Sequence, residues 1–330
     1  MTDLSTTYLG LPLTSPLVAS PSPLTGTIEG LLALEAAGAA AVVLPSLFEE
    51  QLALDAELWA QADTANIQGR REHDVDLDLY NAGSASYLRL VERARSRLEF
   101  PVIASLNCAR ATSWPEYTRM LVGAGAQAIE LNVHIVPVDP SRSSQLVEDD
   151  YVELVGAVAE ASAVPVAVKL APYITAPVHL ATRLEAAGAA GLVLFHRLHE
   201  PDIDLPRVES ISRLNLSTSA ELGLRLRWLA ILRDRVALSL AATGGVWDGE
   251  DALKAVLAGA DAVMVASVLL ERGPSELSRL EVGLSASLAE AGLESVAAAR
   301  GRLSLGGGSA PATADRAAYL RALLGAAARV

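Results

Sequence analysis

The sequence predicts a (β/α)8 barrel, and two observations carry that prediction: a recurring local phrase and the number of strands. The phrase is a small-residue helix end and a glycine followed by a hydrophobic strand, and it occurs four times, at Gly38, Gly125, Gly188 and Gly259. Glycine adopts the left-handed conformation that ends a helix at little cost. A chain that alternates helices and strands in this way forms parallel strands joined by crossover helices.

Eight hydrophobic segments have the length of buried strands, which favours a closed barrel of the TIM type over an open sheet. The predicted strands cover residues 17–20, 40–44, 101–107, 128–133, 165–172, 191–197, 237–244 and 262–267. The predicted helices cover residues 27–37, 115–124, 149–161, 177–187, 219–234, 249–258 and 275–291. The fold class is therefore α/β.

Two long insertions interrupt the alternation, residues 45–100 after strand two and residues 135–150 after strand four. Both leave the carboxyl end of a strand, which is the face on which barrel enzymes build their sites. A glycine-rich hinge at 306–313 leads into a C-terminal helix, which we expect to pack on the barrel or on a partner. We therefore expect one barrel domain over residues 1–305, followed by a hinge and helix over 306–330.

Composition excludes several classes of function. The 330 residues carry a formal net charge of −13, which disfavours binding to a nucleic-acid backbone. Cys108 is the only cysteine, so an intrachain disulfide, a Cys-ligated iron–sulfur cluster and a Cys₄ zinc site are impossible. The histidines show no metal-ligand spacing. No signal peptide and no membrane-length apolar stretch is recognised, so we expect a cytoplasmic protein that binds neither metal nor membrane.

Polar residues occur at inward-facing positions of the central strands. Lys169 lies in the middle of an apolar strand, where an ammonium group is costly unless it meets an anion. Two interpretations are open: Lys169 pairs with an internal carboxylate, or it binds an anionic or electron-rich ligand at the barrel mouth. The alternation of strand side chains places five further polar groups on two shared faces: Ser105, Asn107, Glu130, Asn132 and His134.

A second group of residues lies where strands seven and eight end. Strand seven ends at Gly244–Gly245, just before a helix that begins near Asp248, and strand eight ends at Ala266 and Ser267. Glycines let backbone N–H groups approach an anion, and barrels often bind phosphate with these two loops. The pattern predicts a phosphate site; the alternative is a plain turn with an Asp cap.

These segments resemble the dihydroorotate dehydrogenase family. TGGVWDGEDALKAVLAGADAVMVASVLL at 243–270 is similar to the flavin-phosphate region of that family, and TSPLVASPSP at 14–23 to its first strand. IELNV at 129–133 and PVAVKLAP at 165–172 resemble its strands four and five. The resemblance implies a TIM barrel that binds FMN and forms a homodimer.

The resemblance also implies roles for individual residues. Backbone near the end of strand one would meet the flavin, Asn132 and Lys169 would hold its ring, and the glycine turn would hold its phosphate. A fixed cation at Lys169 would stabilise the negative charge that hydride transfer leaves on a flavin. The implied cofactor-binding residues are Ala19, Ser20, Ser105, Asn107, Asn132, Lys169, Gly244, Gly245, Ala266 and Ser267.

The substrate side departs from the family pattern. Where the family reads N-x-S-C-P-N and uses a Cys or Ser base, this chain reads N-V-H-I-V-P, with Ile135 at the place of the base. His134 is adjacent, and histidine is the side chain whose ordinary pKa lies nearest neutrality, so it is a candidate base. The alternatives are that His134 is a histidine hydrogen-bonded at a strand end and that the proton passes to water. Three serines further along the loop are alternative candidates: Ser141, Ser143 and Ser144.

Three further positions differ from the family. Pro45–Ser46 stands where the family has a Lys-Thr pair, and His196 where it has an asparagine at the end of strand six. Asn81 and Gly83 only loosely match the family's substrate loop. Features that would bind the flavin phosphate are thus retained, whereas features that would bind dihydroorotate are reduced.

We therefore expect a flavin-dependent dehydrogenase that acts on a CH–CH group of a small, anionic molecule, as in pyrimidine biosynthesis, with His134 and Lys169 as catalytic residues. One alternative is a non-catalytic flavin- or phosphate-binding protein that serves a separate electron-transfer partner. A second alternative is a lyase or synthase that acts on a sugar phosphate through a Schiff base on Lys169.

Overall fold

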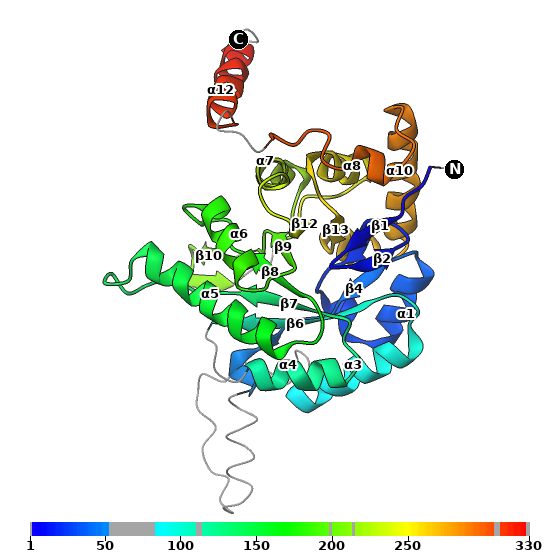
Figure 1. The fold of residues 1–330 in the computed structure, drawn as a ribbon, viewed down its shortest axis with the longest axis vertical. Helices are drawn as coiled ribbons and strands as arrows, with labels where there is room; N and C mark the ends of the chain where they lie inside the picture. The colour runs from blue at the N-terminus through cyan, green and yellow to red at the C-terminus, as the bar shows by residue number, and fades with distance from the viewer. Residues whose placement is uncertain are drawn as a thin grey trace, which may run out of the picture.

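The barrel is closed in the computed structural model, which describes residues 2–52, 83–109, 114–197, 200–212, 215–306 and 311–327. Eight parallel strands form it in chain order, and pairing of the last strand with the first completes the circle (Figure 1). The predicted barrel is confirmed. Its strands are β3 (Leu17–Ala19), β4 (Ala41–Val43), β6 (Val102–Cys108), β7 (Ala128–Val133), β8 (Val166–Leu170), β9 (Gly191–Leu194), β12 (Ser239–Thr243) and β13 (Ala262–Val265).

Helices cover the outside of the barrel at each predicted position. The four glycines that end them have φ values of 92° at Gly38, 103° at Gly125, 97° at Gly188 and 125° at Gly259, as the recurring phrase predicts. The helices are α1 (Ile28–Ala36), α4 (Trp114–Gly123), α5 (Ser144–Ala161), α6 (Pro177–Ala186), α7 (Leu222–Leu232), α8 (Gly249–Ala258) and α10 (Glu276–Glu290), with the short α9 (Ser267–Arg272) and α11 (Val296–Ala299).

The helix after strand four begins five residues earlier than predicted. The hydroxyl of Ser143 accepts a hydrogen bond from the backbone N–H of Leu146, so Ser143 is the N-cap of α5. The first turns of α5 are exposed and polar, and the hydrophobic pattern therefore does not reveal them.

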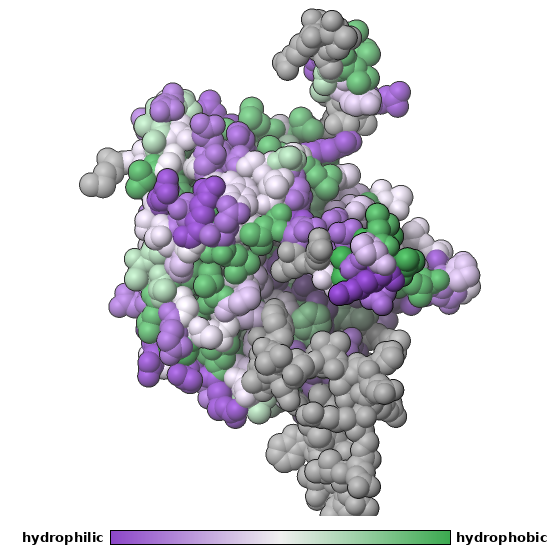
Figure 2. Space-filling model, turned by 180° about the vertical axis from the view of Figure 1, so that it is seen from behind, coloured by the Kyte–Doolittle hydropathy of each residue, from purple (hydrophilic) through white to green (hydrophobic). Residues whose placement is uncertain are grey.

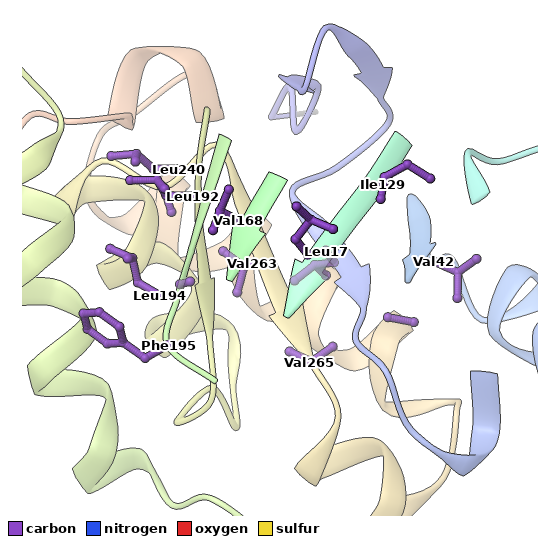
Figure 3. Packing of buried hydrophobic residues seen from close by; sticks show 14 of the residues in the cluster. Leu17, Val42, Ile129, Val168, Leu192, Leu194, Phe195, Leu240, Val263 and Val265 are labelled. Carbon is purple, nitrogen blue, oxygen red and sulfur yellow. The ribbon is translucent and has the colours of Figure 1, made fainter. Parts of the chain in front are cut away.

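Two hydrophobic clusters hold the barrel together. The outer cluster joins outward-facing strand side chains to the helices, and Figure 3 shows Leu17, Ile129 and Val168 among them. The inner cluster fills the amino-terminal half of the barrel with small residues such as Ala41 and Ala128. Because the inner cluster ends below the carboxyl mouth, the polar residues of the strands are left to line that mouth.

A hairpin that the sequence analysis did not predict closes the amino-terminal end of the barrel. It consists of β1 (Thr6–Tyr8) and β2 (Leu11–Leu13), and Tyr8, Leu9 and Leu13 belong to the inner cluster. The backbone N–H of Leu9 donates to the hydroxyl of Ser239 at the start of β12. The hairpin thus seals the end opposite the mouth.

The first predicted insertion contains regular structure, and a third insertion is present that was not predicted. After β4, the chain forms β5 (Leu47–Phe48), which pairs with β6, and later α3 (Ser84–Arg97). Residues 53–82, including Asn81, lie outside the described part of the chain. A third insertion follows β9, where β10 (Pro201–Asp204) and β11 (Glu209–Ser212) form an antiparallel hairpin. The strand that was predicted over 191–197 ends earlier, at Leu194.

The C-terminal helix α12 (Pro311–Ala327) projects from the barrel beyond α7 (Figure 1). Figure 2 shows hydrophobic surface on the segment that stands apart from the body of the molecule. The large apolar side chains of α12 are exposed in the single chain: Tyr319, Leu320, Leu323 and Leu324. Docking of this helix on the barrel or a partner, and the division at residue 305, stay predictions. No helix in the described ranges combines the length and apolar character needed to cross a membrane.

Candidate functional site at the barrel mouth

The strand register gathers the predicted polar residues at the carboxyl end of the barrel. Asn107 of β6 pairs with Asn132 of β7, and Asn132 pairs with Lys169 of β8, so three neighbouring strands present polar side chains at one level. One step lower, Ser105 lies beside Glu130. This layer stands directly above the apolar inner cluster.

Lys169 and Glu130 form a buried ion pair. The Nζ atom of Lys169 lies 2.8 Å from Oε1 of Glu130, and the two residues are 6% and 1% exposed. Of the two interpretations of Lys169, pairing with an internal carboxylate is thus observed. An ammonium has three donors, so the pair leaves two for a ligand. A Schiff-base lysine must instead present a free amine, and this geometry disfavours that alternative.

Three polar atoms around this pair are buried without a hydrogen-bond partner in the described part of the chain. They are Oε2 of Glu130, Oδ1 of Asn132 and Nε2 of His196. Buried polar atoms are normally satisfied, and three orphans beside one another indicate a place where a polar ligand completes the network. The group therefore has the character of a binding site rather than of a finished core.

Two histidines lie beside each other at the mouth. The rings of His134, which follows β7, and His196, which follows β9, have centroids 5.4 Å apart at an angle of 57°. Burial lowers the pKa of His196 from 6.5 to about 3, with the nearby His134 and Lys169 adding to the effect and a backbone hydrogen bond at Arg197 opposing it. His196 is therefore a neutral imidazole at physiological pH.

Ser105 is held by two neighbours. Its hydroxyl lies 2.8 Å from the hydroxyl of Ser46, and the Tyr87 hydroxyl of α3 accepts from its backbone N–H and donates to its backbone oxygen. Ser46, which stands at a position that departs from the family pattern, thus supports the same layer. Ser105 is fully buried.

The glycine turn after β12 lies against the loops after β9 and β13. Gly244 and Gly245 both have φ of +84°, which side chains rarely adopt. The N–H of Gly245 donates to the hydroxyl of Ser217, and that hydroxyl lies 2.9 Å from the hydroxyl of Ser267. Ala266 precedes α9 at the same end of the barrel. Backbone and hydroxyl donors from three loops therefore converge here.

The remaining candidates differ in what they present to the mouth. Ser20 is buried at the end of β3, and its N–H donates to the backbone oxygen of Val265. The side chain of Ala19 belongs to the outer cluster, so only its backbone can face the site. Asn107 is half-buried at the level of Asn132.

The loop after β7 presents no hydroxyl or thiol at the position where the family resemblance implies a Cys or Ser base. Ile135 packs against the outer hydrophobic cluster. Ser141 donates to Asp139, Ser143 caps α5 and Ser144 begins it, and all three are exposed. The nearby Cys108 is fully buried, and burial raises the pKa of its thiol well above the ordinary value, with a smaller effect of Glu49. His134, next to Ile135, is therefore the side chain in this loop that remains a candidate base.

Two residues of the site were missed in the sequence analysis. Ser217 lies in a loop without hydrophobic pattern, and only the folded chain brings it to Gly245. Arg225 lies on the buried face of α7 between Leu222 and Leu229, and its guanidinium contacts the glycine turn. An arginine at a core-facing helix position was a signal that could have identified it.

Comparison with known proteins agrees with this geometry. A family model for dihydroorotate dehydrogenase matches residues 76–288. The dihydroorotate dehydrogenase B (NAD(+)) catalytic subunit of Thermoplasma acidophilum is 27% identical over 289 residues, covering 83% of this chain and 90% of that protein. The dihydroorotate dehydrogenase A (fumarate) of Limosilactobacillus reuteri is 33% identical over 177 residues, covering 51% of this chain and 56% of that protein. With more than half of its length matched by the family model, this chain belongs to the dihydroorotate dehydrogenase family and is a dihydroorotate dehydrogenase-like oxidoreductase.

Proposed function

We propose that the protein is an FMN-dependent oxidoreductase that acts on a CH–CH group of a small anionic molecule. The observation that carries the proposal is the set of buried, unpartnered polar atoms around the ion pair of Lys169 and Glu130, at the mouth of the barrel. A site of this composition suits a planar heterocycle with carbonyl and N–H groups, because such a ring offers both donors and acceptors.

The donor sets on the two sides of the mouth fit the two ends of FMN. Lys169 and Asn132 would hold the ring, with Ser105 and Asn107 at the neighbouring strand. Gly245, Ser217 and Ser267 would hold the phosphate, since backbone N–H and hydroxyl groups are its usual partners. Bound FMN would supply the hydride acceptor that the protein's own side chains lack.

The chain's own residues then divide the remaining work. Lys169 keeps a positive charge fixed beside the ring, and Glu130 fixes its position. His134 takes the proton from the substrate at its imidazole nitrogen. His196, neutral because it is buried, hydrogen-bonds the substrate without adding charge.

One observation favours a second candidate, a non-catalytic flavin-binding protein that serves a redox partner. Ile135 stands at the place of the family's base and packs against the hydrophobic cluster, so that position has become part of the core. In this case, His134 would be a structural histidine, and the site would retain its cofactor without turning over a substrate.

The experiment begins with the absorption spectrum of the purified protein, where we expect flavin bands between about 350 and 500 nm. The flavin is then photoreduced without oxygen and mixed with orotate, fumarate and related acceptors. Reoxidation by an acceptor supports the catalytic proposal, and loss of this reoxidation in His134→Gln assigns the proton transfer. His179→Gln, at an exposed position on α6, is the matched control.

A colourless protein that does not take up added FMN would overturn the proposal as a whole. A flavin that no acceptor reoxidises would favour the non-catalytic candidate. Reoxidation that is unchanged in His134→Gln would remove His134 from the mechanism while leaving the cofactor assignment intact.

We also propose that the protein is a cytoplasmic homodimer that contributes to pyrimidine biosynthesis, with a separate electron-transfer partner. The partner is suggested by the name of the Thermoplasma relative, which is the catalytic subunit of an NAD(+) enzyme. The exposed apolar side chains of α12 offer a surface for a second subunit. Light scattering of the full chain and of a chain ending at residue 305 tests the dimer and the role of the helix.

A further inference from the structure

A charged triad lies beside the glycine turn and has no role in the proposed chemistry. The Nε atom of Arg225 donates to the backbone oxygen of Thr243 at 3.0 Å, directly before the turn, and its Nη1 donates to the backbone oxygen of Glu221 at 2.8 Å. Both carboxylate oxygens of Glu221 accept a hydrogen bond from Nη1 of Arg197 at 3.2 Å. The same carboxylate lies 3.9 Å from Nη2 of Arg225. One carboxylate thus serves two guanidinium groups.

Arg225 touches the turn itself. A Cβ atom built on Gly244 would lie 3.1 Å from its Nη2, and a Cβ on Gly245 would lie 2.6 Å from the backbone nitrogen of Leu222. The start of α7 therefore packs directly on the turn, and Arg225 ties the two together. Because Arg225 is only 7% exposed, this contact is shielded from water.

Among the residues that the structure describes, the triad leaves one positive charge without a partner in a strongly acidic protein. Arg197 and Arg225 carry two positive charges and Glu221 one negative charge, while the chain as a whole has a net charge of −13. The neighbouring Asp251 is neutralised by Lys254. Burial lowers the pKa of Arg225, the charge of Glu221 opposes this, and like-charge repulsion from Arg197 acts in the same direction as burial. An anion at the turn would offset both costs.

We infer that Arg225 is a positioning and specificity residue for the terminal phosphate of the flavin, and that the uncompensated charge of the triad makes the site prefer FMN over riboflavin. Arg225 fixes the turn whose N–H groups meet the phosphate, and it supplies the positive potential there. The inference rests on the proposed function and deepens it, because it assigns the selection of the phosphorylated cofactor to residues outside the donor set.

The test measures the affinity of the flavin-free protein for FMN and for riboflavin by quenching of flavin fluorescence. Arg225→Gln should weaken FMN binding by about a hundredfold, as expected for loss of one unit charge about 6 Å from a phosphate charge at an effective dielectric constant of about 20, and leave riboflavin binding nearly unchanged. Glu221→Gln, which keeps the side-chain shape and removes the negative charge, should strengthen FMN binding. Arg321→Gln on α12 is the control for overall charge.

The inference predicts opposite effects of Arg225→Gln and Glu221→Gln on FMN affinity. A merely structural role of the triad would instead make both variants bind both FMN and riboflavin more weakly. If Arg225→Gln does not fold, Arg225→Lys, which keeps the charge, and Glu221→Gln still test the prediction. An FMN-to-riboflavin affinity ratio that is equal in the wild type and the Glu221→Gln variant overturns the inference alone. A wild-type protein that binds neither flavin overturns the proposed function and the inference together.

Discussion

Acid should destabilise this protein through His196, and the size of the effect follows from its environment. Burial holds the pKa of the folded imidazole at about 3, whereas the unfolded chain has the ordinary value of 6.5. The unfolded state therefore binds the extra proton over this window. The resulting stability is fully present above pH 6.5 and is lost as the pH falls towards about 3.

The shift corresponds to roughly 4–5 kcal/mol over the whole window, at about 1.4 kcal/mol per pKa unit. Between pH 7 and pH 5, linkage gives a loss of about 2 kcal/mol in the free energy of unfolding that is attributable to this one residue. His196→Asn places at this position the amide of the family pattern, which does not titrate, and should abolish that component. The groups that face His196 are His134 from the end of β7 and Lys169 from β8, and both are common to the two proteins.

Urea unfolding of the wild type and of His196→Asn at pH 7, 6 and 5 is the assay. The wild type should lose about 2 kcal/mol more than the variant across this range, because the carboxylates titrate alike in both and cancel. Parallel loss of stability in the two proteins would refute the reasoning, since it would mean that His196 takes up its proton equally in the folded and unfolded chains.

Three further substitutions probe the stability of the barrel. Lys169→Met leaves the carboxylate of Glu130 buried alone and should lower the free energy of unfolding in urea by about 3–5 kcal/mol. Replacing Glu130 by Leu as well should recover most of the lost stability. A double variant that recovers none would contradict the assignment of the loss to an unpaired buried charge. Gly245→Ala should cost about 2 kcal/mol or more in thermal unfolding, because its Cβ would lie 2.6 Å from a backbone nitrogen of α7; Gly10→Ala, with φ of +75° and open space, should cost less. Asp261→Asn should lower the free energy of unfolding by about 2–3 kcal/mol, since the carboxylate of Asp261 binds two arginines and a strand amide. An unchanged midpoint of urea unfolding would show that these contacts contribute nothing to stability.

The fold was predictable because its signals are local. Four helices end at a glycine that adopts a positive φ, and each buried parallel strand must be apolar, so these marks can be read from the sequence without the fold. The hairpin of β10 and β11 carries neither mark. Its strands PDID and ESIS are exposed and rich in residues with low strand propensity, and only backbone pairing identifies them. The buried face of α3, with Tyr87, Val91 and Ala94 at helical spacing, was a usable signal inside the insertion.

The candidate site was predictable where it depends on the alternation of side chains along strands, and not where it depends on how separate segments pack. Strand parity places Glu130, Asn132 and Lys169 on the inward face of the barrel without knowledge of the fold beyond the barrel. It does not tell whether the ammonium meets a carboxylate or a ligand, because that choice depends on a cross-strand distance. Ser217 and Arg225 reach the turn from the loop after β9 and from α7, and their contacts depend on how those segments pack.

The two ends of the site differ in how freely they can change. The proposed phosphate end is built from backbone, since Gly244 and Gly245 hold positive φ values against α7, and a side chain there strains the barrel. The proposed substrate end is built from side chains just past the last strand pairs, since His134 comes directly after Val133 and His196 comes two residues after Leu194. Substitution of these side chains breaks no ladder hydrogen bond. Under the proposed function, a member of this family can therefore keep its cofactor end while its substrate end changes, which accounts for two histidines and an isoleucine at positions where the family resemblance implies other residues.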